Sequence, residues 1–478
     1  MAQDIDTRAA TLRKTTEAHG QEHVFRFWDE LDSAGREQLI TQLEALDWER
    51  LSKWITTYVL ATPELDIPGD LKPAEYYPAI PETPHQEQLY SEAMSLGRHL
   101  LREGRVAGFT VAGGQGTRLG FNGPKGTYPI SPVKDKTLFQ LFAEGVLRTC
   151  EKYDVIIPWY IMTSPLNDQA TRDFFVANDY FGLCPENVSF FSQGVLPAVD
   201  TQGKLLLATK DSLALSPDGH GGSLLALRQS GALDEMRERG IDTISYWQVD
   251  NPLVHMFDPL FLGLHDELGS QMSCRALIKT GPYEKLGNFC DVDGRVEIIE
   301  YSDMPEELAE AQDDDGRLTF RAGSPAIHVL NREFVESLTE SGRLNLPVHR
   351  AHKKVAHVDD DGRRVKPEEP NAVKFEMFIF DALPMAQNVL ILEAVREEQF
   401  GPVKNKSGVD SAESCRTLLV ERAARWLDEA GIPVPRKKNG EPDCVVELSP
   451  RRFLDPEDVA AAAADLTSPE RGAREYFD

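Results

Sequence analysis

The sequence predicts an α/β protein built on a central, mostly parallel mixed sheet with helices on both faces. Between residues 87 and 395, short apolar runs alternate with segments whose apolar residues recur at helical spacing. The apolar runs are continuous rather than alternating with polar residues, which is typical of parallel strands buried on both faces. A cluster of glycines follows the first of these strands, at the end where such sheets bind ligands.

The expected elements follow one another in the order that this fold requires. The predicted strands are Val106–Val111, Ile156–Met162, Val188–Phe191, Ile244–Val249, Ser273–Ile278, Arg295–Ile299 and Val389–Leu392. The predicted helices are Thr137–Cys150, Asp168–Ala177, Ser223–Ser230 and Pro259–Leu268. Side chains that directly follow a strand are therefore the first candidates for a ligand site.

The chain divides into three predicted regions, because 478 residues exceed what a single core usually supports. Residues 1–86 are expected to form a charged helical region followed by a proline-rich connector, in which long elements are prevented. Residues 87–395 form the central domain, and residues 396–478 a small C-terminal domain. The elements predicted in that last domain are a helix at Ala412–Ala430, a strand at Val445–Leu448 and a helix at Val459–Ala464.

The composition limits the partners that the protein can bind. It is 41% hydrophobic and 27% charged, as in ordinary globular proteins, but its formal net charge is −27. Nucleic acid and anionic membranes would be repelled by such a charge, and a polyphosphate could bind only where cations or a divalent metal are concentrated. The six cysteines are scattered without a C-x-x-C pair, which indicates free thiols and a cytoplasmic location. A monomer is compatible with these features.

The most informative segment is the glycine-rich stretch that follows the strand ending at Val111. A loop with so few side chains lets backbone amides approach phosphate oxygens closely, and Thr137 is the expected N-cap of the helix that comes next. Strand, bare loop with two cations, and helix together predict a site for nucleotide phosphates. The loop residues expected to contact the ligand are Ala112, Gly113, Gly114, Gln115, Gly116, Arg118 and Lys125.

The two common phosphate-binding motifs do not fit this stretch. A dinucleotide fingerprint needs G-x-G-x-x-G, and here the third glycine, Gly120, comes one position late. A P-loop needs glycine before its lysine and serine or threonine after it, whereas Lys125 lies between Pro124 and Gly126. The pattern therefore disfavours a dehydrogenase and a kinase of the P-loop type.

Asp250 ends the apolar run of the fourth predicted strand. A buried carboxylate must be solvated, serve as a cap or bind a cation, because leaving it bare is costly. Next to a phosphate loop, coordination of Mg²⁺ or Mn²⁺ becomes the favoured hypothesis, since Mg²⁺ takes one or two carboxylates together with phosphate oxygens. A helix or turn cap is the alternative.

Three further features have both a structural and a functional interpretation. The turn at Gly219 and His220 opens a helix and could bring backbone close to a base or sugar, with His220 as a ligand or a hydrogen-bonding loop residue. Lys374 lies in an apolar run, where a lysine either reaches solvent or faces an anion. The histidines at 349, 352 and 357 resemble metal spacing, but the cations among them indicate a solvated surface instead. The two Asp-Gly segments near 315 and 361 are expected to be hairpin turns rather than metal loops.

Eight ordered motifs between residues 105 and 405 resemble those of the eukaryotic-type UDP-N-acetylhexosamine pyrophosphorylases, within the wider UTP–sugar-1-phosphate uridylyltransferases. They include the glycine loop with Pro124-Lys125-Gly126, the segment from Pro158 to Ser164, and Phe190 to Gly194. The later ones are Asp218-Gly219, Val249-Asp250-Asn251, Glu300-Tyr301-Ser302, Lys374 with Phe378 to Asp381, and Arg396-Glu397 through Lys404-Asn405.

The resemblance implies a Rossmann-like central domain of the nucleotide-diphospho-sugar transferase type and a reaction of UTP with a hexose-1-phosphate that gives a UDP-sugar and pyrophosphate. Carried over by motif, the glycine loop with Arg118 and Lys125 holds the phosphates of UTP. By the same resemblance, Gln193 and Gly219 contact the uracil, Asp250 the metal and the nucleotide, and Glu300 and Tyr301 the sugar; Lys374 and Lys404 meet phosphates, Lys404 that of the sugar. The sugar phosphate is already an anionic nucleophile, so cations and positioning suffice and no general base is needed.

Two residues depart from the acetamido-sugar pattern. His220 and Ser324 stand where that branch usually carries asparagine, and a Gly-His-Gly turn is similar to UDP-glucose and broad-specificity UDP-sugar pyrophosphorylases. The expected product is UDP-N-acetylglucosamine or another UDP-N-acetylhexosamine, with UDP-glucose or a broad range of sugars as the alternative. A non-catalytic nucleotide-sugar-binding protein is the remaining hypothesis, and the intact cations speak against it.

Overall fold

The computed structural model describes residues 5–61 and 71–478, and within them it shows two compact units. The smaller unit consists of the chain up to Ile67 together with Gly194–Gly222 and Leu346–Ile379; the larger unit contains the remaining three segments. Each unit thus draws on separate stretches of the sequence. The predicted division into three regions stays a prediction. Residues 62–70 of the predicted connector lie outside the described residues.

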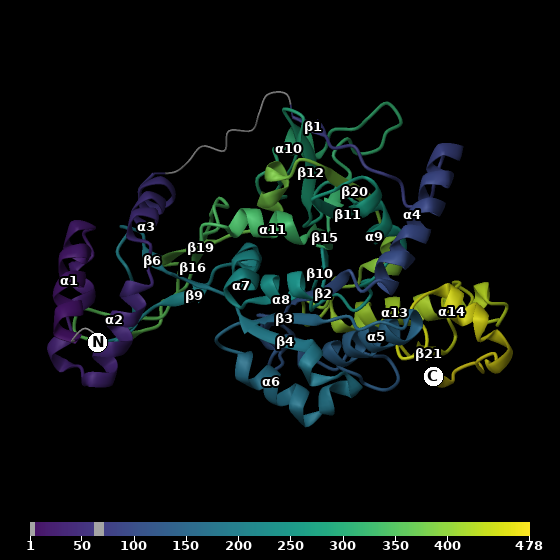
Figure 1. Cartoon of the computed structure of the whole chain (residues 1–478), viewed down its shortest axis with the longest axis horizontal. Helices are drawn as coiled ribbons and strands as arrows, with labels where there is room; N and C mark the ends of the chain where they lie inside the picture. The colour runs from purple at the N-terminus through teal and green to yellow at the C-terminus, as the bar shows by residue number, and fades with distance from the viewer. Residues whose placement is uncertain (1–4, 62–70) are drawn as a thin grey trace. The chain divides into compact units, whose positions relative to one another are not determined.

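The larger unit is built around a sheet of eleven strands among the described residues, ordered β1-β12-β14-β11-β15-β10-β2-β3-β4, with β13 beside β12 and β20 beside β11 (Figure 1). Its strands are β1 Lys72–Pro73, β2 Val106–Val111, β3 Trp159–Thr163, β4 Val188–Ser192, β10 Thr243–Gln248, β11 Met272–Ile278, β12 Gly287–Val292, β13 Arg295–Ile299, β14 Ala322–Ser324, β15 His328–Asn331 and β20 Val389–Glu393. The unit also has a pair β21 Val445–Leu448 and β22 Arg474–Phe477.

The sheet has a parallel half and an antiparallel half, which confirms the predicted mixed α/β fold. Strands β10, β2, β3 and β4 run parallel, and β20 runs parallel to β11. Strand β15 lies antiparallel between β10 and β11, and β12, β13 and β14 continue the sheet as antiparallel neighbours. The parallel half carries the long apolar runs. None of the antiparallel strands β12, β14 and β15 was predicted, and β14 and β15 have only three and four residues.

Helices pack on the sheet of the larger unit and on its C-terminal part. They are α4 Pro84–Arg102, α5 Leu138–Tyr153, α6 Asp168–Ala177, α7 Ser223–Gln229, α8 Ala232–Glu238, α9 Pro259–Glu267, α10 Glu306–Ala309, α11 Arg332–Thr339, α12 Arg396–Gln399, α13 Ala412–Glu429 and α14 Pro456–Ala461. Thr137 caps α5 by accepting a hydrogen bond from the amide of Gln140, as predicted. Helix α14 begins three residues before its predicted start because Asp455 caps it and Pro456 occupies its first turn.

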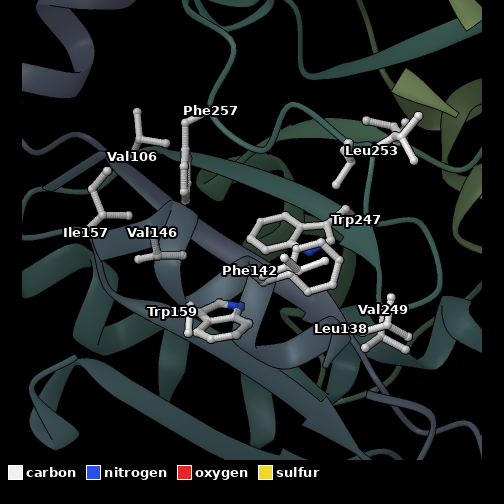
Figure 2. Close-up of a cluster of buried hydrophobic side chains, with 14 of the residues drawn as sticks. Val106, Leu138, Phe142, Val146, Ile157, Trp159, Trp247, Val249, Leu253 and Phe257 are labelled. Atoms are coloured by element: carbon white, nitrogen blue, oxygen red, sulfur yellow. The ribbon is translucent and has the colours of Figure 1, made fainter. Parts of the chain in front are cut away.

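The main core of the larger unit lies between the sheet and helices α4, α5 and α9. Alternate residues of the parallel strands face it, among them Val106, Trp159 and Trp247, and Phe142 and Val146 of α5 pack against them (Figure 2). Helices α4 and α9 cross in close contact: a Cβ atom on Gly97 would lie 1.8 Å from the carbonyl oxygen of Pro259. A second core, formed by Ala423 to Phe477, belongs to the C-terminal part.

The smaller unit combines three helices with short strands. The helices are α1 Ile5–Ala18, α2 Ser33–Glu44 and α3 Trp48–Trp54. The strands are β5 Val195–Pro197, β6 Val199–Asp200, β7 Leu207–Thr209, β8 Ser212–Leu213, β9 Leu215–Pro217, β16 His349–Lys353, β17 His357–Val358, β18 Arg364–Val365 and β19 Ala372–Glu376. The Asp-Gly segment between β17 and β18 forms the predicted hairpin turn, with Gly362 at φ +75°. The other Asp-Gly segment, in the larger unit, also turns the chain back, at Gly316.

Candidate functional site

The glycine loop leaves the carboxyl end of β2 and folds back on itself. The amide of Gly116 donates to the carbonyl of Gly123 at 2.9 Å, and the amide of Lys125 donates to the carbonyl of Gly114 at 3.0 Å. Gly120 takes a φ of +74° and closes the 3-10 turn Gly116–Leu119. Within the part of the chain that the structure describes, the amides of Gly113, Gly114 and Gln115 donate to no acceptor. Three consecutive free amides at a strand end form a concave donor surface suited to an anion.

Lys125 and Asp250 meet beside this loop. The Lys125 Nζ lies 3.3 Å from the Asp250 Oδ2, and both side chains are mostly buried, at 18% and 11% exposure. Asp250 follows β10, the neighbour of β2 in the sheet, so the parallel register brings the two strand ends together. The structure therefore places these two predicted residues in direct contact.

Lys404 is held near Asp250 by backbone contacts. The amide of Val403 donates to the carbonyl of Asp250 at 2.8 Å, and the amide of Lys404 to the carbonyl of Asp410 at 2.7 Å. The side chain of Asn251 fixes the same segment by bonds to Gln399 and Gly401. The pKa of the Asp410 carboxyl is raised, chiefly by burial; Lys404 opposes the shift and Asp250 adds to it. Asp410 is a residue that the sequence analysis did not select.

The predicted cations have few acidic partners, although acidic residues outnumber basic ones by 78 to 51. Among the described residues, Arg118, Lys374 and Lys404 form no ion pair with a carboxylate, and Lys125 pairs only with Asp250. Arg118 lies exposed in the 3-10 turn of the loop. Cations left without partners in so acidic a chain favour binding of an anionic ligand at these positions.

Gln193 and Gly113 touch each other across the end of the parallel sheet. Gln193 is 8% exposed, and its amide donates to the carbonyl of Thr163 at 2.9 Å. A Cβ atom on Gly113 would lie 2.2 Å from the Gln193 Oε1, so only glycine leaves room for this side chain. The structure thus brings the predicted uracil contact against the predicted phosphate loop.

Glu300, Tyr301 and Ser324 lie at the end of the antiparallel half of the sheet. Ser324 in β14 pairs with Gly287 in β12, and the Glu300 Oε1 lies 3.3 Å from where a Cβ atom on Gly287 would stand. Tyr301 is 42% exposed next to them. Glu300 and Ser324 therefore lie next to the same glycine, where a Cβ atom would collide with the Ile298 Cγ2 at 2.5 Å.

The remaining predicted residues belong to the smaller unit. Gly219, at φ +88°, approaches the backbone of Met377 so closely that a Cβ atom would lie 2.4 Å from its carbonyl oxygen. The amide of Met377 donates to the carbonyl of Asp218 at 2.8 Å, and that of Gly221 to the carbonyl of Met377 at 2.8 Å. Lys374 lies on β19, opposite Ala351 of β16.

His220 is a neutral side chain with a defined tautomer. Its Nδ1 accepts a hydrogen bond from the amide of Ile379 at 3.2 Å, so the Nε2 carries the proton. Burial, aided by His349, lowers the pKa of His220 to about 4. The ring stacks on Phe378, and His349 stacks on Phe378 as well, with ring centroids 5.1 and 4.4 Å apart. His349 is only partly exposed and stacks on this ring, whereas His352 of the same predicted solvated surface is exposed.

Asp218, next to Gly219, is a buried carboxyl that the sequence analysis left without a role. It is 5% exposed, and in the described residues its Oδ1 has no hydrogen-bond partner. Its Oδ2 lies 2.4 and 2.2 Å from where Cβ atoms on Gly194 and Gly222 would stand. Burial raises the pKa of Asp218 to about 7.

Comparisons with known proteins identify the family of the chain. A family described as UTP–glucose-1-phosphate uridylyltransferase matches residues 77–468. The chain belongs to this family. It is 37% identical over 469 residues to the UDP-N-acetylhexosamine pyrophosphorylase-like protein 1 of Xenopus tropicalis, covering 92% of this chain and 91% of that protein. It is 34% identical over 436 residues to the UDP-N-acetylglucosamine pyrophosphorylase of Saccharomyces cerevisiae, covering 87% and 90%.

A solved structure supports the fold. The crystal structure of the uridine diphosphate N-acetylglucosamine pyrophosphorylase from Trypanosoma brucei matches with a TM-score of 0.82 at 22% identity, over 100% of this chain and 99% of that one. As a uridylyltransferase-family protein, the chain is a nucleotidyltransferase enzyme.

The described residues were also compared with the features expected of a metal centre and of a membrane-spanning helix. Among residues 5–61 and 71–478, no group of three or more His, Cys, Asp or Glu side chains is arranged to bind a metal ion. No helix in the same residues is long and apolar enough to cross a membrane. A metal at Asp250 would therefore depend on phosphate oxygens for further ligands, which is the donor set that Mg²⁺ prefers.

Proposed function

We propose that the protein joins UTP to an N-acetylhexosamine-1-phosphate, releasing pyrophosphate and forming a UDP-N-acetylhexosamine, with N-acetylglucosamine as the preferred sugar. The observation that carries the proposal is a cluster at one end of the parallel sheet. It combines the free amides of the glycine loop, the Lys125–Asp250 ion pair, and Lys404, which forms no ion pair with a carboxylate among the described residues. The names of the relatives support the acetamido sugar.

The reaction needs charge and alignment more than proton transfer. A phosphate oxygen of the sugar phosphate attacks the α-phosphorus of UTP, the new P–O bond forms in line, and the bond to the β-phosphate breaks with its electrons leaving on pyrophosphate. The nucleophile is already ionised, so the main obstacles are the repulsion of two anions and the charge that grows on the leaving group. Lys404 would hold the sugar phosphate, and Lys125, Arg118 and the loop amides would hold the phosphates of UTP.

Asp250 fits a divalent cation that acts together with the nucleotide. One of its oxygens contacts Lys125, and one carboxylate with phosphate oxygens suffices for Mg²⁺ or Mn²⁺. When bound, such an ion would supply additional positive charge next to the phosphates. Asp410 lies in the same electrostatic field and adds a second carboxyl to this region.

The choice of sugar rests on residues that the two specificity classes do not share. Glu300, Tyr301 and Ser324 would face the sugar, and His220 would lie on the loop that reads the nucleotide. Serine and histidine here favour the second candidate, a UDP-glucose or broad-specificity UDP-sugar pyrophosphorylase. The six unpaired cysteines fit the cytoplasmic location proposed for either enzyme.

The test is a pyrophosphate-release assay with UTP, Mg²⁺ and a panel of sugar-1-phosphates. We expect the highest kcat/KM with N-acetylglucosamine-1-phosphate. Release with glucose-1-phosphate at an equal or higher kcat/KM would select the second candidate. No release with any sugar phosphate, despite nucleotide binding, would contradict both.

A further inference from the structure

Asn167 stands at the N-cap position directly before α6, but its side chain does not cap that helix. Asparagine at an N-cap normally accepts a hydrogen bond from an amide of the first turn, and here no such bond is present. The side chain is 1% exposed, so it does not face solvent either. The usual structural explanation for this residue therefore does not apply.

The side chain instead binds the glycine loop. Its Nδ2 donates to the carbonyl of Ala112 at 2.9 Å and to the carbonyl of Gly114 at 3.2 Å. Its Oδ1 accepts from the amide of Ser164 at 2.8 Å and from the Ser164 hydroxyl at 3.0 Å. Two donors and two acceptors are the full capacity of a primary amide, so the orientation of this amide is fixed.

Fixing these two carbonyls also fixes two amides. In a trans peptide the N–H points opposite to the C=O of the same plane. The Ala112 carbonyl shares its plane with the amide of Gly113, and the Gly114 carbonyl with the amide of Gln115. With both carbonyls turned toward Asn167, both amides point away from it, and in the described residues neither has an acceptor.

We propose that Asn167 is a positioning residue that aims the amides of Gly113 and Gln115 at oxygen atoms of the bound nucleotide. The inference rests on the proposed function, because it takes the glycine loop as the nucleotide site. Preorganised amides bind an anion without a free-energy cost for reordering the loop. Losing the hydrogen bonds from Asn167 should therefore weaken nucleotide binding.

The decisive variant is Asn167→Asp, which keeps the shape of the side chain and replaces its two N–H donors by an oxygen. That oxygen would face two carbonyl oxygens, and the loop would turn away. We expect UTP to bind at least about tenfold more weakly in calorimetry, because a hydrogen bond to a charged group contributes enough to change affinity by that factor. The matched control is Asn178→Asp at the other end of α6, where the side chain only contacts the carbonyl of Phe174 at an exposed position.

A pH series separates positioning from a general structural defect. Protonation of the new carboxyl restores one O–H donor, so the loss of UDP-N-acetylglucosamine affinity in Asn167→Asp, measured relative to the wild type at the same pH, should become smaller as the pH is lowered. Comparison with the wild type at each pH removes effects common to both proteins, such as the ionisation of Asp218. Hydrogen exchange gives a second readout: nucleotide should protect the segment 112–116 in the wild type and not in the variant at pH 8.

The outcomes distinguish the two claims. If the wild type fails to bind UTP, the proposed function is overturned, and the inference with it. If the wild type binds but Asn167→Asp binds as tightly as Asn178→Asp, the positioning role is wrong while the proposed function stands. If Asn167→Asp does not fold, Ser164→Ala, which removes one of the two bonds that hold the amide, should weaken UTP binding several-fold. Unchanged binding in that variant would also overturn the inference.

Discussion

Two sets of predicted binding residues, one in each unit, carry charge in opposite ways. In the larger unit, Lys125 and Asp250 form a charged pair and Lys404 is left without an acidic partner among the described residues. In the smaller unit, burial raises the pKa of Asp218 to about 7 and lowers that of His220 to about 4, so at neutral pH His220 carries no charge and Asp218 only a partial one. The difference teaches that charge is kept where phosphates would bind and suppressed next to Gly219, where an uncharged base would bind.

The largest expected effect comes from substitutions in the Lys125–Asp250 ion pair. Lys125→Ala and Asp250→Asn should each lower kcat/KM for UTP by about a thousandfold, because a preorganised group that stabilises transition-state charge contributes a factor of this size. Pyrophosphate release at saturating sugar phosphate measures the effect. Lys437→Ala is the matched control, since Lys437 pairs with Glu441 on an exposed surface. Thermal unfolding must show folded variants, and wild-type rates in either one would contradict the charged site.

Ionisation of Asp218 should affect the free energy of unfolding rather than turnover. The pKa of Asp218 is raised from 3.8 to about 7, so between these pH values the unfolded chain loses a proton that the folded chain keeps. Stability therefore falls as pH rises from about 4 to 7, and the penalty is complete above pH 7. A shift of this size corresponds to at most about 4 kcal/mol.

Asp218→Asn tests that prediction. The variant removes the charge but leaves a buried amide that needs partners, so we expect about 2 kcal/mol of added stability at pH 8 and almost none at pH 4. Urea unfolding at the two pH values measures it. Asp29→Asn, an exposed change in the same unit, is the control. Equal stabilisation at both pH values would show that Asp218 does not ionise as proposed.

The sequence predicted the parallel half of the sheet well, because local pattern determines it. The range Val106–Val111 matches β2 at both ends, since a continuous apolar run ends there in glycines. Strand β3 begins at Trp159 rather than at Ile156, which is 62% exposed, because Pro158 has no N–H to donate. The short strands β12 and β14 could not be predicted reliably, because their polar residues depend on tertiary partners: Asn288 is fully buried and accepts from Lys279.

The residues of the candidate site also fall into those that the sequence could identify and those that it could not. Residues that follow strands, such as Asp250, could be selected from sequence, because parallel strand ends meet at one edge of the sheet. Their roles stay predictions. Asn167 was missed because an asparagine before a helix already has a local explanation. Asp218 was missed as a buried acid because its burial depends on Gly194 and Gly222, which only the fold brings to it.

A smaller effect should separate base contacts from phosphate contacts within the larger unit. In Gly113→Ala the added methyl group would collide with the Gln193 Oε1, and the flexible side chain should move rather than the fold. We expect KM for UTP to rise about tenfold, the value of one lost hydrogen bond in a buried site. In a Gln193→Ala background the same substitution should cost much less, because the collision is gone. An equal increase in KM in both backgrounds would show that the added methyl group displaces the loop and not the side chain of Gln193.

The smallest expected effect concerns the choice of sugar, and it depends on His220. His220→Asn replaces a ring that stacks on Phe378 and accepts at Nδ1 from the amide of Ile379 by an amide of the kind usual in acetamido-sugar enzymes. The new side chain is smaller and can both donate and accept, so it can pair with an acetamido group. We expect the ratio of kcat/KM for N-acetylglucosamine-1-phosphate over glucose-1-phosphate to rise about threefold to tenfold, the range of one added hydrogen bond.

Ser324→Asn, made separately and together with His220→Asn, shows whether the two positions act on the same part of the sugar. Additive changes in the ratio indicate separate contacts, and a non-additive change indicates a shared one. An unchanged ratio in His220→Asn would mean that the histidine serves only to hold the loop against Phe378 and Ile379.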